Sequence, residues 1–356
     1  MLIDFEEKLR GKNILITGGL GFIGSNLARK LVSLNLKKIV LVDSCIKGLG
    51  SNFANVDDIK DKIEIFKGEE WDLRNKEKIK LLIKDADIIF NLAGSVSHIG
   101  SKEDPLFDFE LNLKSHLQFL EACKECMKEG KKNLKVIYSG TRDQYGKVRE
   151  EHLPVNEEYL IHEATDPQGI NKNATEFFHF WYANHFKFNV VSLRLTNTYG
   201  PRHIMTDAGQ GVLNWFIRQA MDNQTLELWG GGEQLRDFNF VDDVVEAMLM
   251  VAISEKANNQ AYNLGSFIKK LGLYGQIGNN VISVGDVAKL VVKIAKNGKW
   301  VEIPYPADRK PLEPGHFYAD ASKIYNEIGW EPKTDIEEGI KKTIEFYKEN
   351  KKKYWQ

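Results

Sequence analysis

A glycine-rich turn in ILITGGLGFIGSNLARKLV (14–32), between an apolar run and a helical pattern, most limits the folds open to this chain. Gly19, Gly21 and Gly24 have no side chains, so backbone N–H groups and the positive end of the following helix can approach a pyrophosphate. The glycines are not followed by Gly-Lys-Ser or Gly-Lys-Thr, which excludes a phosphate loop for nucleotide hydrolysis. The turn therefore favours dinucleotide binding over an ordinary tight turn.

The next apolar run, KIVLVD, ends in Asp43. An acidic residue at about this distance from the glycines typically bonds the ribose hydroxyls of the adenosine. A carboxylate there also repels a 2′-phosphate, so the sequence predicts NAD rather than NADP as the cofactor.

Buried-strand runs alternate with helical patterns through the first half of the chain. The runs are KNILITGG, KIVLVDS, IEIFKG, ADIIFNLAG, LKVIYSG and NVVSLRL. This order predicts an α/β fold of Rossmann type, a doubly wound parallel sheet with helices on both faces. After Thr198 the loops become rich in Gly, Pro and Arg, which indicates a smaller, mixed α/β substrate lobe.

These patterns predict a division into two domains. Residues 1–195 form the NAD-binding domain, and the helical pattern within 237–262 returns to pack on it. Residues 196–236 and 263–356 form the C-terminal substrate-binding lobe.

Charge and cysteine content exclude several other classes of protein. The chain of 356 residues carries 49 basic and 50 acidic side chains, so no general field attracts nucleic acid or an anionic membrane. No signal-peptide pattern or membrane-spanning run is found, and we expect a cytoplasmic protein. Cys123 and Cys126 lie in FLEACKECMKEG, which reads as an amphipathic helix, and with Cys45 they predict no metal site.

A series of different motifs is spread along nearly the whole chain. TGGLGFIG, WDLRN, NLAGSVSH, YSGTRDQYG, the helix with Lys172, LRLTNTYGPR, GGGEQLRDFNFVDD and FYADASKIYNEIGW stand in this order. In this combination the chain resembles the extended short-chain dehydrogenases/reductases, the NAD-dependent nucleotide-sugar epimerase/dehydratase family.

The resemblance implies a set of cofactor contacts. Asp72 and Leu73 would flank the adenine, and Lys172 would hold the nicotinamide ribose. The other implied contacts are Gly18, Gly19, Gly21, Phe22, Ile23, Gly24, Asp43, Leu92, Ala93 and Gly94.

It also implies contacts with a nucleotide-diphosphate sugar. Thr141 would bond the reacting sugar hydroxyl, Ser95 would face the sugar, and Asn197, Arg236 and Arg309 would face the diphosphate. Arginine suits that role because its planar fork of N–H groups matches phosphate oxygens. His98 follows a strand at the edge where such sheets bind ligands, and both a substrate contact and a structural histidine remain open there.

One residue departs from the family pattern. Members usually carry Tyr-x-x-x-Lys, whereas QGINK places Gln168 four residues before Lys172. A phenol near a lysine can accept a hydroxyl proton, but an amide has no accessible ionised form. Gln168 can orient a hydroxyl and cannot be the base. The only other such spacing, Tyr347 to Lys351, lies in the charged terminal helix and is interpreted as unrelated.

Three interpretations of this departure stay open. Another group takes the proton: Asp143, at a position where related dehydratases carry a glutamate, His98, or a water. Alternatively, the enzyme performs one oxidation or reduction only, as a 4-dehydrogenase or ketoreductase. Finally, the chain binds NAD and a nucleotide sugar as a regulatory protein without chemistry.

The resemblance implies hydride transfer from a sugar carbon, C4, to NAD, followed by return of the hydride to the opposite face or by elimination. These motifs do not determine the nucleotide base of the substrate or the identity of its sugar. In the family, helices equivalent to DPLFDFELNLKSHLQFLEACKECM and NATEFFHFWYANHF pair between subunits as a four-helix bundle. We therefore expect a homodimer, or a dimer of dimers, built through such a bundle.

Overall fold

The computed structural model describes residues 4–34, 36–159, 163–206, 209, 211–270, 272–277, 279–307 and 313–355. The chain forms two compact units. Unit 1 contains residues 1–144, 166–194 and 245–262, and unit 2 contains residues 145–165, 195–244 and 263–356. The sequence placed 145–165 in the first domain, whereas its contacts lie with unit 2, where Val155 forms a β-bridge with Ala319.

Unit 1 is built on a seven-stranded sheet with the order β10-β6-β5-β4-β1-β2-β3. Strands β3, β2, β1, β4 and β5 pair in parallel. This arrangement confirms the predicted Rossmann-type sheet. The strands are β1 Asn13–Thr17, β2 Lys38–Asp43, β3 Glu64–Lys67, β4 Ile88–Asn91, β5 Lys135–Thr141, β6 Asn189–Leu195 and β10 Gln260–Leu264.

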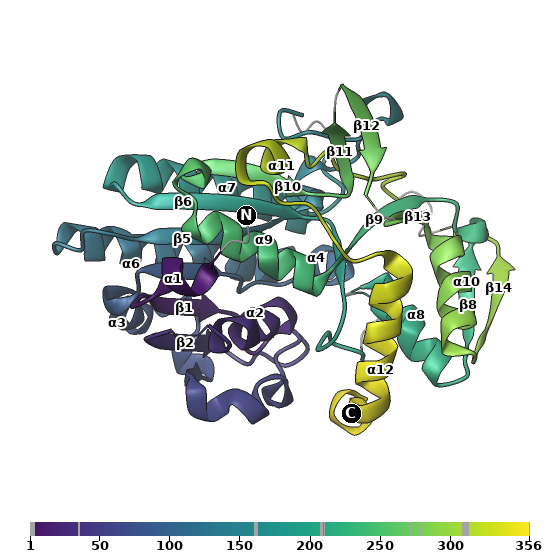
Figure 1. The fold of residues 1–356 in the computed structure, drawn as a ribbon, viewed down its shortest axis with the longest axis horizontal. Helices are drawn as coiled ribbons and strands as arrows, with labels where there is room; N and C mark the ends of the chain where they lie inside the picture. Colours follow the sequence, from purple (N-terminus) through teal and green to yellow (C-terminus); the bar gives the residue numbers. More distant parts are fainter. Residues whose placement is uncertain are drawn as a thin grey trace. The chain divides into compact units, whose positions relative to one another are not determined.

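Helices connect these strands and cover both faces of the sheet. In Figure 1, α2 and α9 lie on the viewer's side of the strands. The helices are α1 Phe5–Leu9, α2 Phe22–Val32, α3 Lys76–Asp85, α4 His98–Glu103, α5 Pro105–Phe109, α6 Ser115–Lys128, α7 Pro167–Phe186 and α9 Val241–Ile253, with a π-helical turn at Glu110–Lys114.

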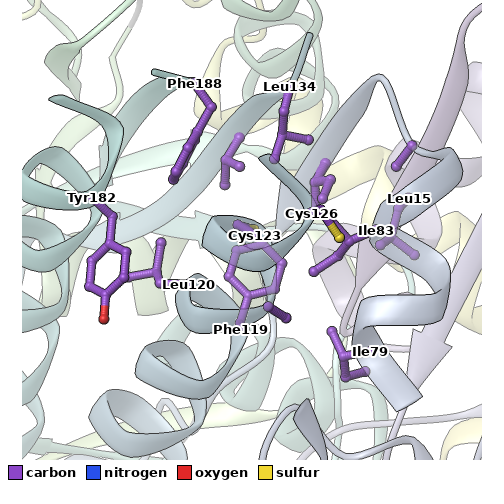
Figure 2. Packing of buried hydrophobic residues seen from close by; sticks show 14 of the residues in the cluster. Leu15, Ile79, Ile83, Phe119, Leu120, Cys123, Cys126, Leu134, Tyr182 and Phe188 are labelled. Atoms are coloured by element: carbon purple, nitrogen blue, oxygen red, sulfur yellow. The ribbon is translucent and has the colours of Figure 1, made fainter. Parts of the chain in front are cut away.

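The core on the face covered by α3, α6 and α7 is drawn in Figure 2. Phe119 and Cys123 of α6 are fully buried there, against Leu15 of β1 and Ile79 of α3. The apolar period of α6 accounts for this, since one face of the helix meets the sheet and α3 while charged residues point outward. Ile89 of β4 and Val136 of β5 belong to this core, and the residues that follow these two strands form the candidate site.

Unit 2 is a mixed α/β structure around a second core. Its strands are β7 Asn197–Tyr199, β8 Thr225–Trp229, β9 Leu235–Phe240, β11 Phe267–Lys270, β12 Leu273–Gln276, β13 Val281–Ser283 and β14 Lys299–Ile303. Its helices are α8 Val212–Met221, α10 Val284–Ala295, α11 Ser322–Ile328 and α12 Ile336–Tyr354. Tyr347 of α12 is fully buried in this core, and its hydroxyl donates to the His203 carbonyl oxygen at 2.9 Å, which gives it a structural role.

Short 3₁₀ turns complete the fold, at Phe53–Asn55, Asp57–Lys62, Glu69–Trp71, Arg142–Tyr145, Glu150–His152, Gly230–Gly232 and Glu255–Ala257. Within the described ranges, no helix combines the length and the apolar character that crossing a membrane would require.

Candidate active site

The glycine-rich turn joins β1 to α2, as the sequence predicts. Gly21 is the N-cap of α2, so no capping side chain covers the helix start. Gly24 is needed for close packing, because a Cβ there would stand 2.4 Å from the Gly18 carbonyl oxygen. The turn therefore presents backbone donors and the positive helix end, the arrangement that suits a pyrophosphate.

Asp43 ends β2 next to this turn, and only 7% of its surface is exposed. One carboxylate oxygen accepts from the Leu20 backbone N–H at 3.1 Å. The other accepts from the Ser51 hydroxyl at 2.6 Å and from the Cys45 N–H at 2.9 Å. These bonds hold the carboxylate in one orientation beside the glycine turn.

Asp72 and Leu73 follow a 3₁₀ turn that comes after β3. The Asp72 carboxylate forms two bonds with the Arg74 guanidinium, at 2.8 and 3.1 Å. Leu73 is buried in the core of unit 1. Their predicted contact with an adenine stays a prediction.

The segment after β4, residues 92–95, is fixed by a buried hydroxyl. Thr17 Oγ1 accepts from the backbone N–H groups of Leu92 at 3.0 Å and Ala93 at 3.2 Å. The same hydroxyl donates to Asn91 Oδ1 at 2.8 Å. The end of β1 thus holds the start of the segment that was predicted to line the cofactor.

Two buried histidines complete this network. Asn91 Nδ2 contacts His116 Nδ1 at 3.0 Å and His179 Nε2 at 3.1 Å, so both nitrogens act as acceptors. The remaining ring N–H groups donate to the carbonyl oxygens of Ala93 and Thr175. Burial lowers the pKa of His179 to about 4 and that of His116 well below its ordinary value. Both rings are therefore neutral at physiological pH and serve to position the backbone.

Gly94 lies where side chains of two helical segments meet the loop. Its φ is +149°, and a Cβ would stand 2.6 Å from Asn112 Oδ1 and 3.1 Å from Lys172 Nζ. Asn112, in the π-helical turn, accepts from the Ser95 N–H at 3.0 Å and donates to the Ser95 carbonyl oxygen at 3.1 Å. Only glycine fits at position 94, and any larger residue would displace the lysine or the asparagine.

Lys172 projects from α7 and is 5% exposed. Its ammonium group donates to the Ser139 carbonyl oxygen at 3.3 Å and lies 5.3 Å from the centre of the Tyr138 ring. Burial lowers the pKa of Lys172 to about 8, and the charge of Asp108 opposes that shift. The cost of burying this cation is offset only in part by the negative charge of Asp108. Such a buried charge indicates a functional rather than a structural group.

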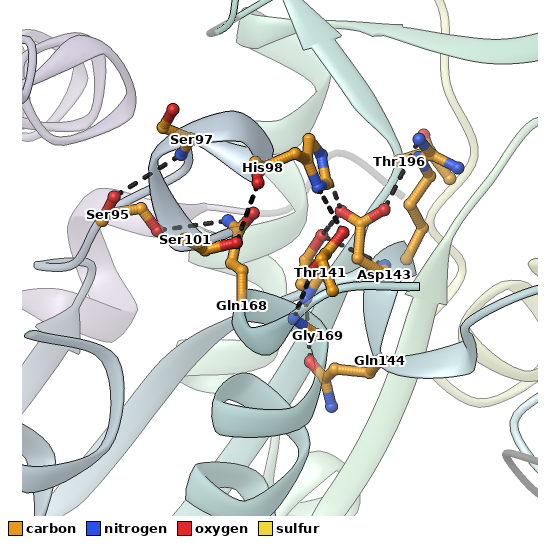
Figure 3. Close-up of polar contacts among 12 residues, drawn as sticks. Ser95, Ser97, His98, Ser101, Thr141, Asp143, Gln144, Gln168, Gly169 and Thr196 are labelled. Atoms are coloured by element: carbon orange, nitrogen blue, oxygen red, sulfur yellow. Dashed lines mark hydrogen bonds and ion pairs between the residues drawn. The ribbon is translucent and has the colours of Figure 1, made fainter. Parts of the chain in front are cut away.

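Thr141 ends β5, and its hydroxyl donates to Asp143 Oδ2 at 2.7 Å. Figure 3 shows His98 directly beside this pair. His98 Nε2 lies 3.5 Å from Asp143 Oδ2, and His98 Nδ1 lies 2.9 Å from Asp166 Oδ2. The Arg142 guanidinium is 3.4 Å from the other Asp143 oxygen. The structure thus brings together three of the predicted residues, Thr141, Asp143 and His98.

Gln168 lies in the first turn of α7 and is 2% exposed. Its Nε2 donates to the Ser95 carbonyl oxygen at 3.2 Å (Figure 3). Its Oε1 is buried and has no hydrogen-bond partner among the described residues. The amide can therefore accept one further hydrogen bond, which fits the predicted orienting role.

Two of the predicted diphosphate contacts, Asn197 and Arg236, lie in unit 2. Arg236 of β9 is 6% exposed, and its guanidinium forms an ion pair with Glu313 and donates to the Gly315 carbonyl oxygen at 2.6 Å. Asn197 of β7 has a buried Oδ1 without a partner in the described part of the chain. Arg309 lies outside the described residues.

The three cysteines are free thiols in different surroundings. Cys123 and Cys126 are buried free thiols in α6, and Cys45 is an exposed one. Burial raises the pKa of all three thiols. The described residues contain no group of three or more His, Cys, Asp and Glu side chains that could hold a metal ion.

Sequence reasoning missed two residues of this site. Asp166 is not among the predicted site residues, although an aspartate before a proline is an N-cap signature, and it also contacts His98. Asn112 gave no local signal, because its role depends on a π-helical turn that brings it to Ser95.

Comparisons with known proteins give matches along nearly the whole chain. Residues 15–343 match the family model described as GDP-mannose 4,6 dehydratase. The chain is 28% identical over 357 residues to the CDP-paratose 2-epimerase of Salmonella typhi, covering 94% of this chain and 98% of that protein.

Two solved structures are similar throughout. UDP-glucose 4-epimerase from Thermotoga maritima, solved with UDP-glucose, has a TM-score of 0.79 and 28% identity, covering 95% of this chain and 99% of that one. The Bordetella bronchiseptica enzyme WbmF, solved in complex with NAD+ and UDP, has a TM-score of 0.76 and 26% identity, covering 97% and 94%.

Proposed function

Because the chain belongs to the GDP-mannose 4,6-dehydratase family, we propose that it modifies a nucleotide-diphosphate sugar by NAD-dependent hydride transfer at a sugar carbon, C4. The reaction is of the epimerase or dehydratase type. The observation that carries this proposal is the buried Lys172 ammonium group against Gly94, in the same unit as the Thr141–Asp143–His98 cluster. A purely structural core has no use for this set of polar groups.

The residues present fit NAD. The uncapped start of α2 offers donors for the pyrophosphate, and Asp43 offers a carboxylate for the adenosine ribose. Lys172 would hold the nicotinamide ribose, and residues 92–94 would line the cofactor. When bound, NAD supplies a two-electron acceptor for the sugar C–H.

The side chains of unit 1 divide the remaining tasks. Thr141 would form a hydrogen bond with the reacting hydroxyl. Gln168 Oε1 would accept a hydrogen bond from the sugar or a water. Asp143 would take the hydroxyl proton, since a carboxylate can accept a proton and an amide cannot. Asn197, Arg236 and Arg309 remain the proposed diphosphate contacts, and substrate phosphate would compete with Glu313 for the Arg236 guanidinium.

The experiment that tests this function is incubation with a panel of UDP-, GDP-, CDP- and dTDP-sugars and NAD. Absorbance at the NADH maximum would follow transient reduction, and NMR would identify products. Conversion of at least one nucleotide sugar is expected. If NAD binds but no sugar in the panel reacts, the chain is a regulatory NAD-binding protein instead.

We also propose that the protein assembles as a homodimer through a four-helix bundle. An exposed apolar surface covers α5 and α7; it consists of Leu106, Phe107, Phe109, Ile170, Phe177, Phe178 and Trp181, each at least 38% exposed. A second copy of this chain is the proposed occupant, because both helices carry the patch and can pair with their symmetry mates.

A further inference from the structure

His98 is held at both ring nitrogens by carboxylates from two other segments of the chain. Nδ1 lies 2.9 Å from Asp166 Oδ2. Nε2 lies 3.5 Å from Asp143 Oδ2 (Figure 3). The His98 side chain is 35% exposed, whereas those of Asp143 and Asp166 are 10% and 3% exposed. The imidazole is thus the most accessible member of the cluster.

The position of Asp166 determines which nitrogen exchanges protons. Its Oδ1 accepts from the Gly169 N–H at 2.9 Å and caps α7, so the carboxylate has a fixed orientation. Its Oδ2 then accepts a hydrogen bond from the ring at Nδ1 and so keeps a proton on that nitrogen, as a carboxylate beside a histidine does. Nε2, which faces Asp143, is left as the nitrogen that gains and loses a proton.

Asp143 connects that nitrogen to the reacting end of β5. The oxygen that faces His98 Nε2 also accepts a hydrogen bond from the Thr141 hydroxyl at 2.7 Å. Asp166, His98, Asp143 and Thr141 therefore form one continuous chain of polar contacts.

The charges around His98 suit a group that holds a proton. Asp143 raises the pKa of His98 above its ordinary value, Asp166 adds to that shift, and burial and Arg142 oppose it. The neighbouring helices α5 and α7 contribute Asp108 and Lys172, whose charges act on each other. An ordinary aspartate has a pKa of about 4 and gives up a proton readily at neutral pH. A group that must take a proton and return it works best with a pKa near the working pH.

We propose that His98 stores the proton removed from the sugar hydroxyl, with Asp143 passing it between the substrate and Nε2. This inference rests on the proposed function. Oxidation of the carbinol releases a hydride, which carries both C–H electrons to the nicotinamide, and a proton from the hydroxyl oxygen. The O–H electron pair stays on that oxygen as the C=O bond forms. The proton moves to Asp143 and then to the Nε2 lone pair. When the hydride returns, the proton goes back to the oxygen by the same route.

His98 thereby supplies the proton-holding capacity that Gln168 cannot provide. Because His98 acts through Asp143, a structural role must be separated from a role in proton storage. Three variants make that separation. His98→Gln removes the titrating ring, Asp143→Asn removes the link, and Asp166→Asn removes the charge while it keeps a good N-cap for α7. His152→Gln, in the exposed 3₁₀ turn of unit 2, is the matched control.

The first measurement is an NMR titration of the histidine side chains in the protein without ligands, with His98 assigned by its loss in His98→Gln. We expect a His98 pKa above its ordinary value, and a lower one in both Asp143→Asn and Asp166→Asn. An ordinary or lowered His98 pKa that Asp143→Asn does not change would overturn the proposal.

The second measurement is the pH profile of NAD reduction in a single turnover, with a nucleotide sugar that the unmutated enzyme accepts. We expect a rate that rises with pH through the His98 pKa found by NMR. His98→Gln should lose that rise and slow reduction by about 10²–10⁴-fold, the usual effect of losing an acid–base group, with a nearly unchanged KM. His152→Gln should behave as the unmutated enzyme.

The two proposals fail in different ways. If the unmutated enzyme reduces NAD and His98→Gln keeps the same pH profile, only the role of His98 is wrong. If no sugar in the panel reduces NAD with the unmutated enzyme, the proposed function falls and the role of His98 falls with it.

Discussion

The side-chain amide of Gln168 is hydrogen-bonded to the backbone of Ser95. Its Nε2 donates to the Ser95 carbonyl oxygen at 3.2 Å, across 73 residues of sequence. Gln168 therefore ties the start of α7 to the loop after β4, and its Oε1 remains available to a ligand. Gln168 has a positioning role that does not require it to change protonation.

Gln168→Ala should consequently have a modest effect on turnover. The variant loses one hydrogen bond to Ser95, worth about 0.5–1.5 kcal/mol, and no proton acceptor. Asp143→Asn should slow turnover by about 10²–10⁴-fold, because the carboxylate is the proposed base. Steady-state kinetics on the two variants would compare them. Abolished turnover in Gln168→Ala with normal turnover in Asp143→Asn would show that Asp143 is not the base.

Lys172→Met should weaken NAD binding without destabilising the protein. The pKa of Lys172 is lowered to about 8, so the folded state binds this proton less tightly than the unfolded state. The ammonium group therefore reduces the free energy of unfolding at neutral pH, and this cost disappears as the pH rises from about 8 to 10.5. At about 1.4 kcal/mol per pKa unit, the cost is on the order of 3 kcal/mol.

Thermal unfolding at pH 7 and calorimetric NAD titration would test this pair of effects. We expect an equal or higher melting temperature and a higher Kd for NAD. Thr141→Val is the contrasting variant, since it should spare NAD binding and impair the chemical step. Unchanged NAD affinity in Lys172→Met would refute the assignment of the lysine to the cofactor.

Asp43→Ala should reduce the preference for NAD over NADP. The carboxylate is fixed by hydrogen bonds from Leu20, Cys45 and Ser51, and it is the proposed acceptor of a ribose hydroxyl. A hydrogen bond to a charged group contributes about 1.5–3 kcal/mol, so the preference should fall about tenfold or more. Fluorescence titration with both cofactors measures the ratio, and Asp43→Asn separates the charge from the hydrogen bonds. The idea fails if the unmutated protein binds NADP more tightly than NAD.

Phe177→Glu should disrupt the proposed dimer. Phe177 is 63% exposed on α7, in the apolar surface shared with α5, and a charge there would be buried on association. Leu273→Glu is the matched control, because Leu273 is 76% exposed on β12 and lies outside that surface. Light scattering at micromolar concentration should give a dimer mass for the unmutated protein and the control, and a lower mass for Phe177→Glu. A monomer mass for the unmutated protein would contradict the assembly.

Asp237→Asn should stabilise the protein at neutral pH. Asp237 is fully buried, and burial raises its pKa to about 6, against three hydrogen bonds that favour the ionised form. Its pKa in the folded state exceeds the ordinary 3.8, so its stabilising contribution is complete below about pH 4 and is lost as the pH rises through 6.

Asparagine can replace the carboxylate in this position. Its oxygen can accept from the N–H groups of Ser266 and Ala319, while its amide can donate to the Ser266 hydroxyl. The expected gain in the free energy of unfolding at pH 7 is up to about 3 kcal/mol, from the size of the pKa change. Melting temperatures at pH 5 and pH 7 measure it, and a loss of stability in the variant at both pH values would contradict the argument.

The sequence by itself determined the parts of the protein that depend on local pattern. Apolar runs in alternation with helical periods predicted the parallel sheet, because a parallel strand must be buried on both faces. The glycine turn before α2 was predicted because only glycine allows the close approach of Gly24 to Gly18. The acid at the end of β2 was predicted from its distance along the chain from that turn. Thr141, Lys172 and Gln168 were identified through motif positions that a resemblance supplied.

Tertiary structure alone decided which of those residues act together. His98 and Asp166 are 68 residues apart in sequence, and they meet because the segment after β4 and the start of α7 lie side by side. Arg236 likewise forms its ion pair with Glu313 across 77 residues. The physical reason is that periodicity and turn chemistry specify local backbone conformation, whereas a long-range polar contact depends on how whole elements pack, which no short stretch of sequence encodes.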